Sequence, residues 1–148
     1  MRVMKPPLLR ITGSDRRAWG LQHGAHFASE IRELAAIRRQ LLINALGPAW
    51  TSERLDRLCD EQLVAHAERW PEVLIELQGI SEAASISLRD LVILNGYTDL
   101  KDFADTDDAG QRVPAGCSVV SAKGPKINAA GQTWDMHASA EAYLVLCE

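Results

Sequence analysis

A cysteine that directly follows a glycine stands where the sequence changes from loop-like to strand-like chemistry. Residues 104–116 (ADTDDAGQRVPAG) are acidic, contain glycine and proline and lack periodicity, which is typical of a surface loop. Cys117 then opens the β-branched run CSVVSA. Its thiol could attack the Gly116 carbonyl, and water could hydrolyse the thioester, because glycine tolerates the strained backbone that this attack requires. The position therefore predicts a chain that cleaves itself between Gly116 and Cys117.

Cleavage at this bond would supply the base that the cysteine needs for catalysis. The new N-terminus would carry a free α-amino group beside its own sulfur. Such an amine has a pKa of about 7.7 to 8.0, close to that of a thiol and near neutral pH. It can therefore activate the thiol as a nucleophile, and no histidine is needed.

Helices are expected before this junction. Apolar periodicity and capping residues predict helices over 14–46, 51–70, 71–84 and 87–103. Gly79 is expected to be an irregularity in the third helix. Gly20 and Gly24 are spaced i, i+4 in the first helix, where each costs about 1 kcal/mol of helix propensity. We therefore expect another segment to approach the backbone closely at this pair.

Strands are expected after the junction. The runs 117–122 and 131–147 are β-branched and aromatic, and the turn-like segment 123–131 lies between them. They predict a hairpin followed by a further, buried strand at 142–147, with Cys147 in its core. That strand would leave an unpaired sheet edge, so we expect the protein to continue beyond Glu148.

Four ordered blocks carry a resemblance to a known family. Gly116-Cys117-Ser118 and the later AAGQTWD, which ends at Asp135, resemble the acyl-coenzyme A:isopenicillin N acyltransferase family. This family is the peptidase C45-like branch of the N-terminal nucleophile hydrolases. The stretch GSDRRAWGLQHGAHFASEI is similar to its early helix with a Gly-x-Gln-His-Gly motif, here Gly20 to Gly24. The stretch LQGISEAASISLRDLVILNGYTDL resembles its GIAEGAGLSLEDLLALN segment.

The resemblance implies an α+β fold, namely the helical layer and first strands of an αββα sandwich that is incomplete in this chain. A helical α chain, residues 1–116 with a mobile loop at about 104–116, would be separated from the start of a catalytic β chain, residues 117–148. Cys117 would be both the self-processing and the catalytic nucleophile, and Gly116 would supply the carbonyl attacked in maturation. Asp135 would orient the amine of the cysteine.

Three further residues could line the implied site. Thr133 stands where many relatives have asparagine, and it precedes Trp134; His137 follows closely. The oxyanion-hole asparagine of the family would lie beyond Glu148. Loss of one such donor typically costs about 10²- to 10³-fold in rate, so this chain alone is expected to be inactive without the remainder of the β chain.

The resulting hypothesis is an autoprocessed cysteine amidohydrolase or acyltransferase that forms an acyl-enzyme at Cys117. Its substrate would be a small acyl amide or acyl thioester, and the mechanism requires neither a metal nor another cofactor. Sequence does not choose between hydrolysis and acyl transfer. The alternative is an unprocessed, inactive precursor fragment or a non-catalytic helical interaction module.

Several other classes of function are disfavoured. No signal-length or membrane-length apolar run occurs, so a cytoplasmic protein without a membrane partner is expected. The arginines lack interleaved aromatic residues, which disfavours a nucleic-acid partner. Cys59, Cys117 and Cys147 are an odd number without CxxC spacing, so reduced thiols are expected. His23 and His26 could ligate a metal, but no third ligand is evident, and packing is preferred.

Overall fold

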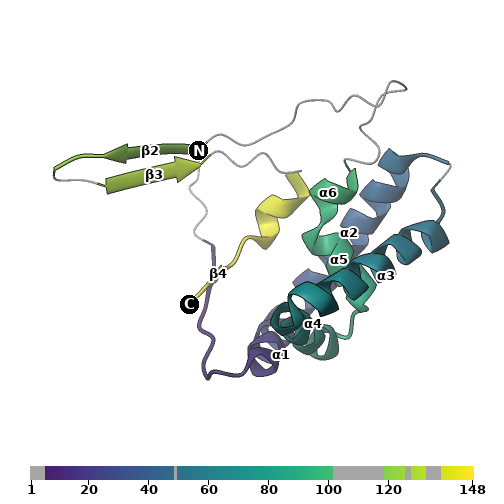
Figure 1. The fold of residues 1–148 in the computed structure, drawn as a ribbon, viewed down its shortest axis with the longest axis horizontal. Coiled ribbons are helices and arrows are strands. Elements are labelled where there is room, and N and C mark those ends of the chain that lie inside the picture. The colour runs from purple at the N-terminus through teal and green to yellow at the C-terminus, as the bar shows by residue number, and fades with distance from the viewer. Residues whose placement is uncertain (1–5, 49, 102–118, 126–127, 133–137) are drawn as a thin grey trace.

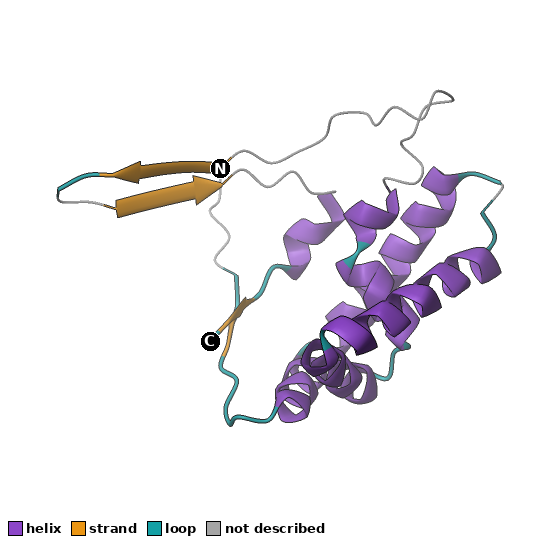
Figure 2. Cartoon of the chain, in the orientation of Figure 1, coloured by secondary structure: helices purple, strands orange, loops and turns teal. Residues whose placement is uncertain are grey.

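The computed structural model describes residues 6–48, 50–101, 119–125, 128–132 and 138–148. This part of the chain is mostly helical with a few short strands, in agreement with an α+β class (Figures 1 and 2). The elements in chain order are β1 (Leu8–Leu9), α1 (Arg16–His26), α2 (Ala28–Leu46), α3 (Ser52–Arg69), α4 (Pro71–Ala84), α5 (Leu88–Asn95), α6 (Tyr97–Lys101), β2 (Val119–Lys123), β3 (Asn128–Gln132), the 3₁₀ helix η1 (Ala138–Tyr143) and β4 (Leu146–Cys147). No helix among these residues has the length and apolar character needed to span a membrane.

Three of the helices begin at the capping residues that the sequence indicated. The Asp15 carboxylate accepts hydrogen bonds from the amides of Arg17 and Ala18, each at 3.2 Å. The hydroxyls of Thr51 and Ser87 accept from backbone amides three residues later, at 3.3 and 3.1 Å. Each cap satisfies an amide that the helix itself leaves without a partner, which is worth about 1 kcal/mol.

Helices α1 and α4 pack backbone against backbone through their glycines. A Cβ atom on Gly20 would overlap the carbonyl oxygen of Glu76, and one on Gly24 would lie 2.7 Å from the carbonyl oxygen of Ile80. The close approach predicted at Gly20 and Gly24 is therefore confirmed. The irregularity predicted at Gly79 is wrong, because α4 continues through it. Its missing side chain instead makes room for α1, since a Cβ there would lie 2.9 Å from the Leu21 nitrogen.

The first predicted helix is two helices in the structure. Phe27 has φ −119° and ψ 31°, outside the helical region, and it separates α1 from α2. Its side chain is buried in the core. The break lets α1 follow α4 while α2 turns to pack against α5 (Figure 1). The last predicted helix is likewise divided, at Gly96, into α5 and α6.

The helices enclose two clusters of buried apolar side chains. One cluster lies where α1, α2, α4 and α5 meet, and it also includes Leu9 of β1: Leu9, Phe27, Ile31, Leu77, Ile80, Ala84 and Leu91. The other joins α2, α3, α5 and α6: Leu42, Leu55, Cys59, Val92, Ile93, Tyr97 and Leu100. Cys59 is fully buried among these side chains.

The strands form two separate pairs. β2 and β3 are antiparallel, with Val119 opposite Gln132 and Lys123 opposite Asn128. The predicted hairpin is thus present, but its second strand begins earlier than expected, inside the segment assigned to the turn. In Figure 1 this hairpin lies away from the helices. β1 and β4 pair in parallel near the C-terminus, with Leu8 opposite Leu146.

The buried strand predicted at 142–147 is wrong. The 3₁₀ helix η1 ends at Tyr143, and only Leu146 and Cys147 form a strand. Leu144 is 44% exposed and Leu146 is 53% exposed, and Cys147 is exposed as well. β4 has a single described neighbour, the two-residue β1, so no layer covers these side chains. The apolar side chains of Leu144 and Leu146 therefore do not belong to the core.

Candidate functional site

The residues predicted to carry catalysis lie outside the part of the chain that the structure describes. This holds for the scissile pair, the acidic partner and the possible lining residues: Gly116, Cys117, Thr133, Trp134, Asp135 and His137. It holds also for the loop at 104–116 and the domain boundary at 116/117. Their roles stay predictions.

The described hairpin brings together the chain segments that adjoin Cys117 and Asp135. Val119, two residues after Cys117, pairs with Gln132, three residues before Asp135. Because β2 and β3 are antiparallel, the start of β2 and the end of β3 share one end of the hairpin. Both candidate residues therefore adjoin the same end of this ribbon along the chain.

The described residues of the Gly-x-Gln-His-Gly motif have structural partners. Gln22 donates from its amide nitrogen to the Thr12 carbonyl at 2.9 Å and accepts from the Thr12 amide at 3.0 Å. This pair of hydrogen bonds holds the segment before α1 against the helix. Gly20 and Gly24 contact α4, and His23 of this motif lines a cavity.

That cavity has a volume of about 390 Å³ and lies between the helices and the C-terminal segment. Its walls are mainly apolar side chains of α2, α4 and α5, closed on one side by residues 142–145 and 147. Among the described residues its polar groups are His23, Glu30, Asn95, Tyr143 and Cys147. An apolar cavity of this size with a few converging polar groups is typical of a small-molecule site.

The charge state at this cavity follows from local contacts. Burial lowers the pKa of His23, which favours the neutral imidazole near pH 7. The pKa of Glu30 is lowered by hydrogen bonding to its own backbone amide and to the Ser29 hydroxyl, which lies 2.8 Å away. Glu30 is therefore ionised and His23 neutral at neutral pH.

A second carboxylate, that of Glu33, lies next to the cavity and is hydrogen-bonded to Tyr143, which lines it. Desolvation raises the pKa of Tyr143, and so do its hydrogen bond to Glu33 and the charges of Glu33 and Glu30. Tyr143 is therefore a protonated hydroxyl that is hydrogen-bonded to Glu33 and close enough to Glu30 to feel its charge. No lysine or arginine is found among the described residues that line the cavity, so its electrostatic character is negative.

Sequence reasoning did not find this cavity. Its polar residues come from three distant parts of the chain, namely the α1–α2 region, α5 and the C-terminal segment, and no motif joins them. One local signal is the position of His23 in the last turn of α1, four residues before Phe27, which also lines the cavity. The rings of His23 and His26 contact Phe27 edge-on, with centroids 6.0 and 4.5 Å from its ring. Packing, the preferred interpretation of the two histidines, is confirmed.

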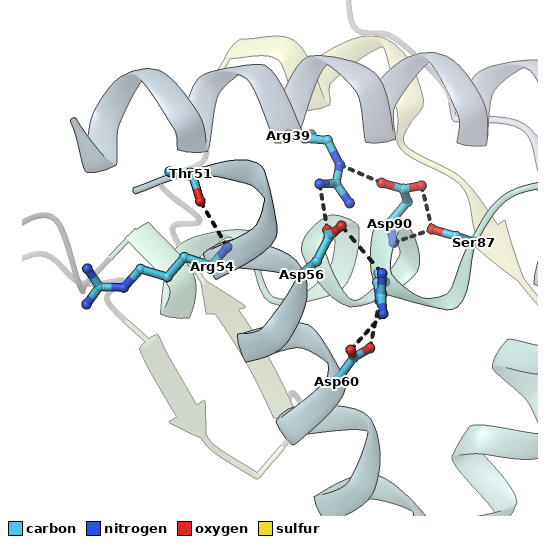
Figure 3. A network of polar contacts seen from close by, with 8 residues as sticks. Arg39, Thr51, Arg54, Asp56, Asp60, Ser87 and Asp90 are labelled. Carbon is cyan, nitrogen blue, oxygen red and sulfur yellow. Dashed lines mark hydrogen bonds and ion pairs between the residues drawn. The ribbon is translucent and has the colours of Figure 1, made fainter. Parts of the chain in front are cut away.

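A network of ion pairs joins α2, α3 and α5 on another face (Figure 3). Arg39 donates to Asp90 at 2.7 Å and to Asp56 at 2.9 Å. Arg89 donates to both oxygens of Asp60 at 2.7 Å and approaches Asp56 at 3.5 Å. Each guanidinium is occupied by carboxylates, and each carboxylate by a guanidinium. The network therefore holds three helices in place, and each of its charged side chains already has a partner within it.

Neither the described cysteines nor the described acidic residues form an evident reactive centre. Burial raises the pKa of Cys59 to about 11, so its thiol is protonated and inert. Within the described residues, no three histidine, cysteine or acidic side chains are grouped so as to hold a metal ion.

A scan against protein-family models and a search of curated proteins gave no match to this chain. The family resemblance therefore rests on the four sequence blocks themselves.

Proposed function

We propose that this chain is part of a cysteine N-terminal nucleophile enzyme that matures by self-cleavage before Cys117. The mature enzyme would hydrolyse an acyl amide or transfer the acyl group of an amide or thioester. One observation carries the proposal. Cys117 comes two residues before β2 in the sequence, β2 pairs with β3, and the chain leads from β3 into the segment that contains Asp135.

Two further features support the proposal. The blocks that resemble the family's early helix and its Gly-Ile segment are both described, and they pack together as α1 on α4 through Gly20, Gly24 and Gly79. The close packing of α1 on α4 therefore explains why glycine stands at these positions. A fold shared with the family would require the same packing. The helices would form an outer layer of an αββα sandwich, and the hairpin would belong to its catalytic sheet.

Maturation would proceed by an acyl shift and hydrolysis. The Cys117 sulfur attacks the Gly116 carbonyl carbon, the C–N bond breaks, and the released nitrogen takes a proton. Water then hydrolyses the thioester, leaving a Gly116 carboxylate and a Cys117 with a free thiol and α-amine. No oxidant or cofactor enters either step.

Turnover would use the same sulfur. The α-amine of Cys117 takes the thiol proton, and the thiolate attacks the acyl carbonyl of the substrate. The leaving amine or thiol takes the proton back as the tetrahedral intermediate collapses to an acyl-enzyme. Water or an acceptor amine then removes the acyl group. Asp135 would hold the α-amine in place.

Mass spectrometry of the purified chain tests the proposal. We expect the wild type to yield a fragment beginning at Cys117, and Cys117→Ala to remain intact. Cys147→Ala is the matched control, because it removes another thiol and should leave cleavage unchanged. An activated acyl ester, whose good leaving group lessens the need for an oxyanion hole, should then add one acyl mass to the fragment that begins at Cys117, although this chain alone is not expected to turn over a substrate. A wild type that stays intact and unreactive at Cys117 would favour a non-catalytic helical module or an inactive precursor.

A further inference from the structure

The cavity between the helices and the C-terminal segment has features of a ligand site that the chemistry of Cys117 does not require. From its shape and charge we infer that it binds a small amphiphile with an apolar chain and a primary-amine head. The inference uses none of the residues in the proposed catalytic machinery. It stands or falls separately from the proposed function.

The walls of the cavity suit an aliphatic chain. Phe27, Ile31 and Leu34 line it from the α1–α2 junction, and Ile80 and Leu91 line it from α4 and α5. A volume of about 390 Å³ is at the lower end of the roughly 300 to 1,000 Å³ range of small-molecule sites. The fit is therefore to a chain of a few carbons and not to a long lipid.

The charges at the cavity select the head group. Glu30 lies in the first turn of α2 and lines the cavity, and Glu33 holds the Tyr143 hydroxyl beside it. The Arg32 guanidinium donates to the Ala84 carbonyl at 2.7 Å and does not line the cavity, but its positive charge acts on Glu30 and reduces the net negative charge there. An ammonium group would find a carboxylate partner here, whereas a ligand carboxylate would be repelled.

Neutral polar groups complete the site. The His23 imidazole and the Asn95 amide line the same cavity, and each can accept a hydrogen bond. An ammonium group offers three donors and no acceptor, so acceptors beside a carboxylate match its needs. A hydroxyl head group could donate one hydrogen bond to these acceptors or to Glu30, but it carries no charge and would gain no ionic attraction from the carboxylate.

Calorimetric titration with hexylamine, hexanol and hexanoate tests the inference. The Cys117→Ala chain is used, so that acyl chemistry at that thiol cannot contribute. We expect hexylamine to bind about fivefold to tenfold more tightly than hexanoate, with the affinity of hexanol between them. This difference in affinity corresponds to the interaction energy of two charges that lie close together but are partly screened by solvent. Equal binding of hexylamine and hexanoate, or no binding of any of the three, would overturn the inference.

Two pairs of matched variants locate the binding. Leu144→Trp should fill the rim of the cavity and abolish binding, whereas Leu146→Trp, at an exposed leucine that does not line it, should not. Both positions are exposed, so neither change threatens folding, which thermal melts would verify. If Leu144→Trp binds hexylamine like the unaltered chain, the cavity is not the site.

The second pair tests the charge. Glu30 and Glu53 each lie in the first turn of a helix, α2 and α3, but only Glu30 lines the cavity. Glu30→Gln should weaken hexylamine about threefold and leave hexanol unchanged. Glu53→Gln should affect neither ligand. An equal loss in both variants would show a general charge effect and contradict the assigned site.

Discussion

Gly20 lies so close to Glu76 that a Cβ atom on Gly20 would overlap the Glu76 carbonyl oxygen and lie 3.0 Å from its carbon. The contact is reciprocal, because a Cβ on Gly79 would lie 3.0 Å from the Gly20 Cα. α1 and α4 therefore meet at their backbones, and backbone atoms cannot move aside as a flexible side chain could. This crossing sets how the first helix lies on the rest of the helical layer.

Gly20→Ala should destabilise the protein. Alanine gains about 1 kcal/mol of helix propensity, but the overlap with α4 forces the two helices apart. Overpacking of this kind costs about 1–3 kcal/mol and more where backbone must shift. We expect a net loss of about 2 kcal/mol in the free energy of unfolding, measured by urea denaturation.

Two companion variants test the cause of this loss. Gly96→Ala places its Cβ 3.1 Å from the Val92 carbonyl oxygen, so this oxygen needs to shift only slightly. The loss in the free energy of unfolding should therefore be much smaller than that of Gly20→Ala. Gly20→Ala with Gly79→Ala should lose less than the sum of the single variants, since one separation of α1 from α4 relieves both overlaps. Strict additivity would argue against a shared contact.

Arg39→Leu should destabilise the packing of α2 against α3 and α5. It leaves Asp56 and Asp90 without their shared partner, and the three side chains are each less than one-third exposed. Removing one member of such a hydrogen-bonded group typically costs about 1–3 kcal/mol. The measurement is again the free energy of unfolding, at low and high salt.

Arg10→Leu is the matched control for this change. Arg10 pairs with Glu148, but both side chains are more than half exposed, so the expected loss is close to zero. A similar loss in both variants would mean that Arg39 acts through its general charge and not through its place between three helices.

Local signals in the sequence predicted the helix starts and the glycine contact, because the chemistry is local. Asp15, Thr51 and Ser87 cap helices through amides two or three residues away, and a glycine pair spaced i, i+4 marks one helix face. The break at Phe27 could not be predicted in this way. It depends on α1 and α2 packing against different partners, which only the tertiary structure supplies.

The exposure of the C-terminal segment and the presence of the cavity could not be predicted from sequence patterns. A short apolar run such as 142–147 does not reveal whether another layer covers it, and here Leu144 and Leu146 are exposed. The cavity joins His23, Glu30 and Tyr143 from three separate elements. Cys117 was instead found from its neighbours in sequence, and its function stays a prediction.

His23 should make the protein less stable in mild acid. Its pKa in the folded state lies below the ordinary value of about 6.5, because burial disfavours the charged imidazole. Above that value both states are neutral, and the stability is fully present. As the pH falls through it, the unfolded state binds a proton first and unfolding is favoured. The loss levels off once the folded state is protonated as well.

Urea denaturation at about pH 7 and pH 5 measures this effect. His23→Gln should lose less stability between the two pH values than the wild type, since glutamine does not titrate. His66→Gln removes an imidazole that packs on Trp70 instead and should retain the effect of His23. An unchanged acid loss in His23→Gln would show that other groups cause it.

The two described cysteines should differ sharply in reactivity. In the Cys117→Ala chain at about pH 8, the exposed Cys147 should react promptly with Ellman's reagent. Cys59 should not react, because a pKa of about 11 leaves only about one thiolate in a thousand at that pH and burial blocks access. Cys147→Ser in the same background should remove the fast reaction, and urea should expose Cys59 as the helices unfold. A fast reaction at Cys59 in native buffer would mean that the core between α2, α3 and α5 opens readily, against the burial seen here.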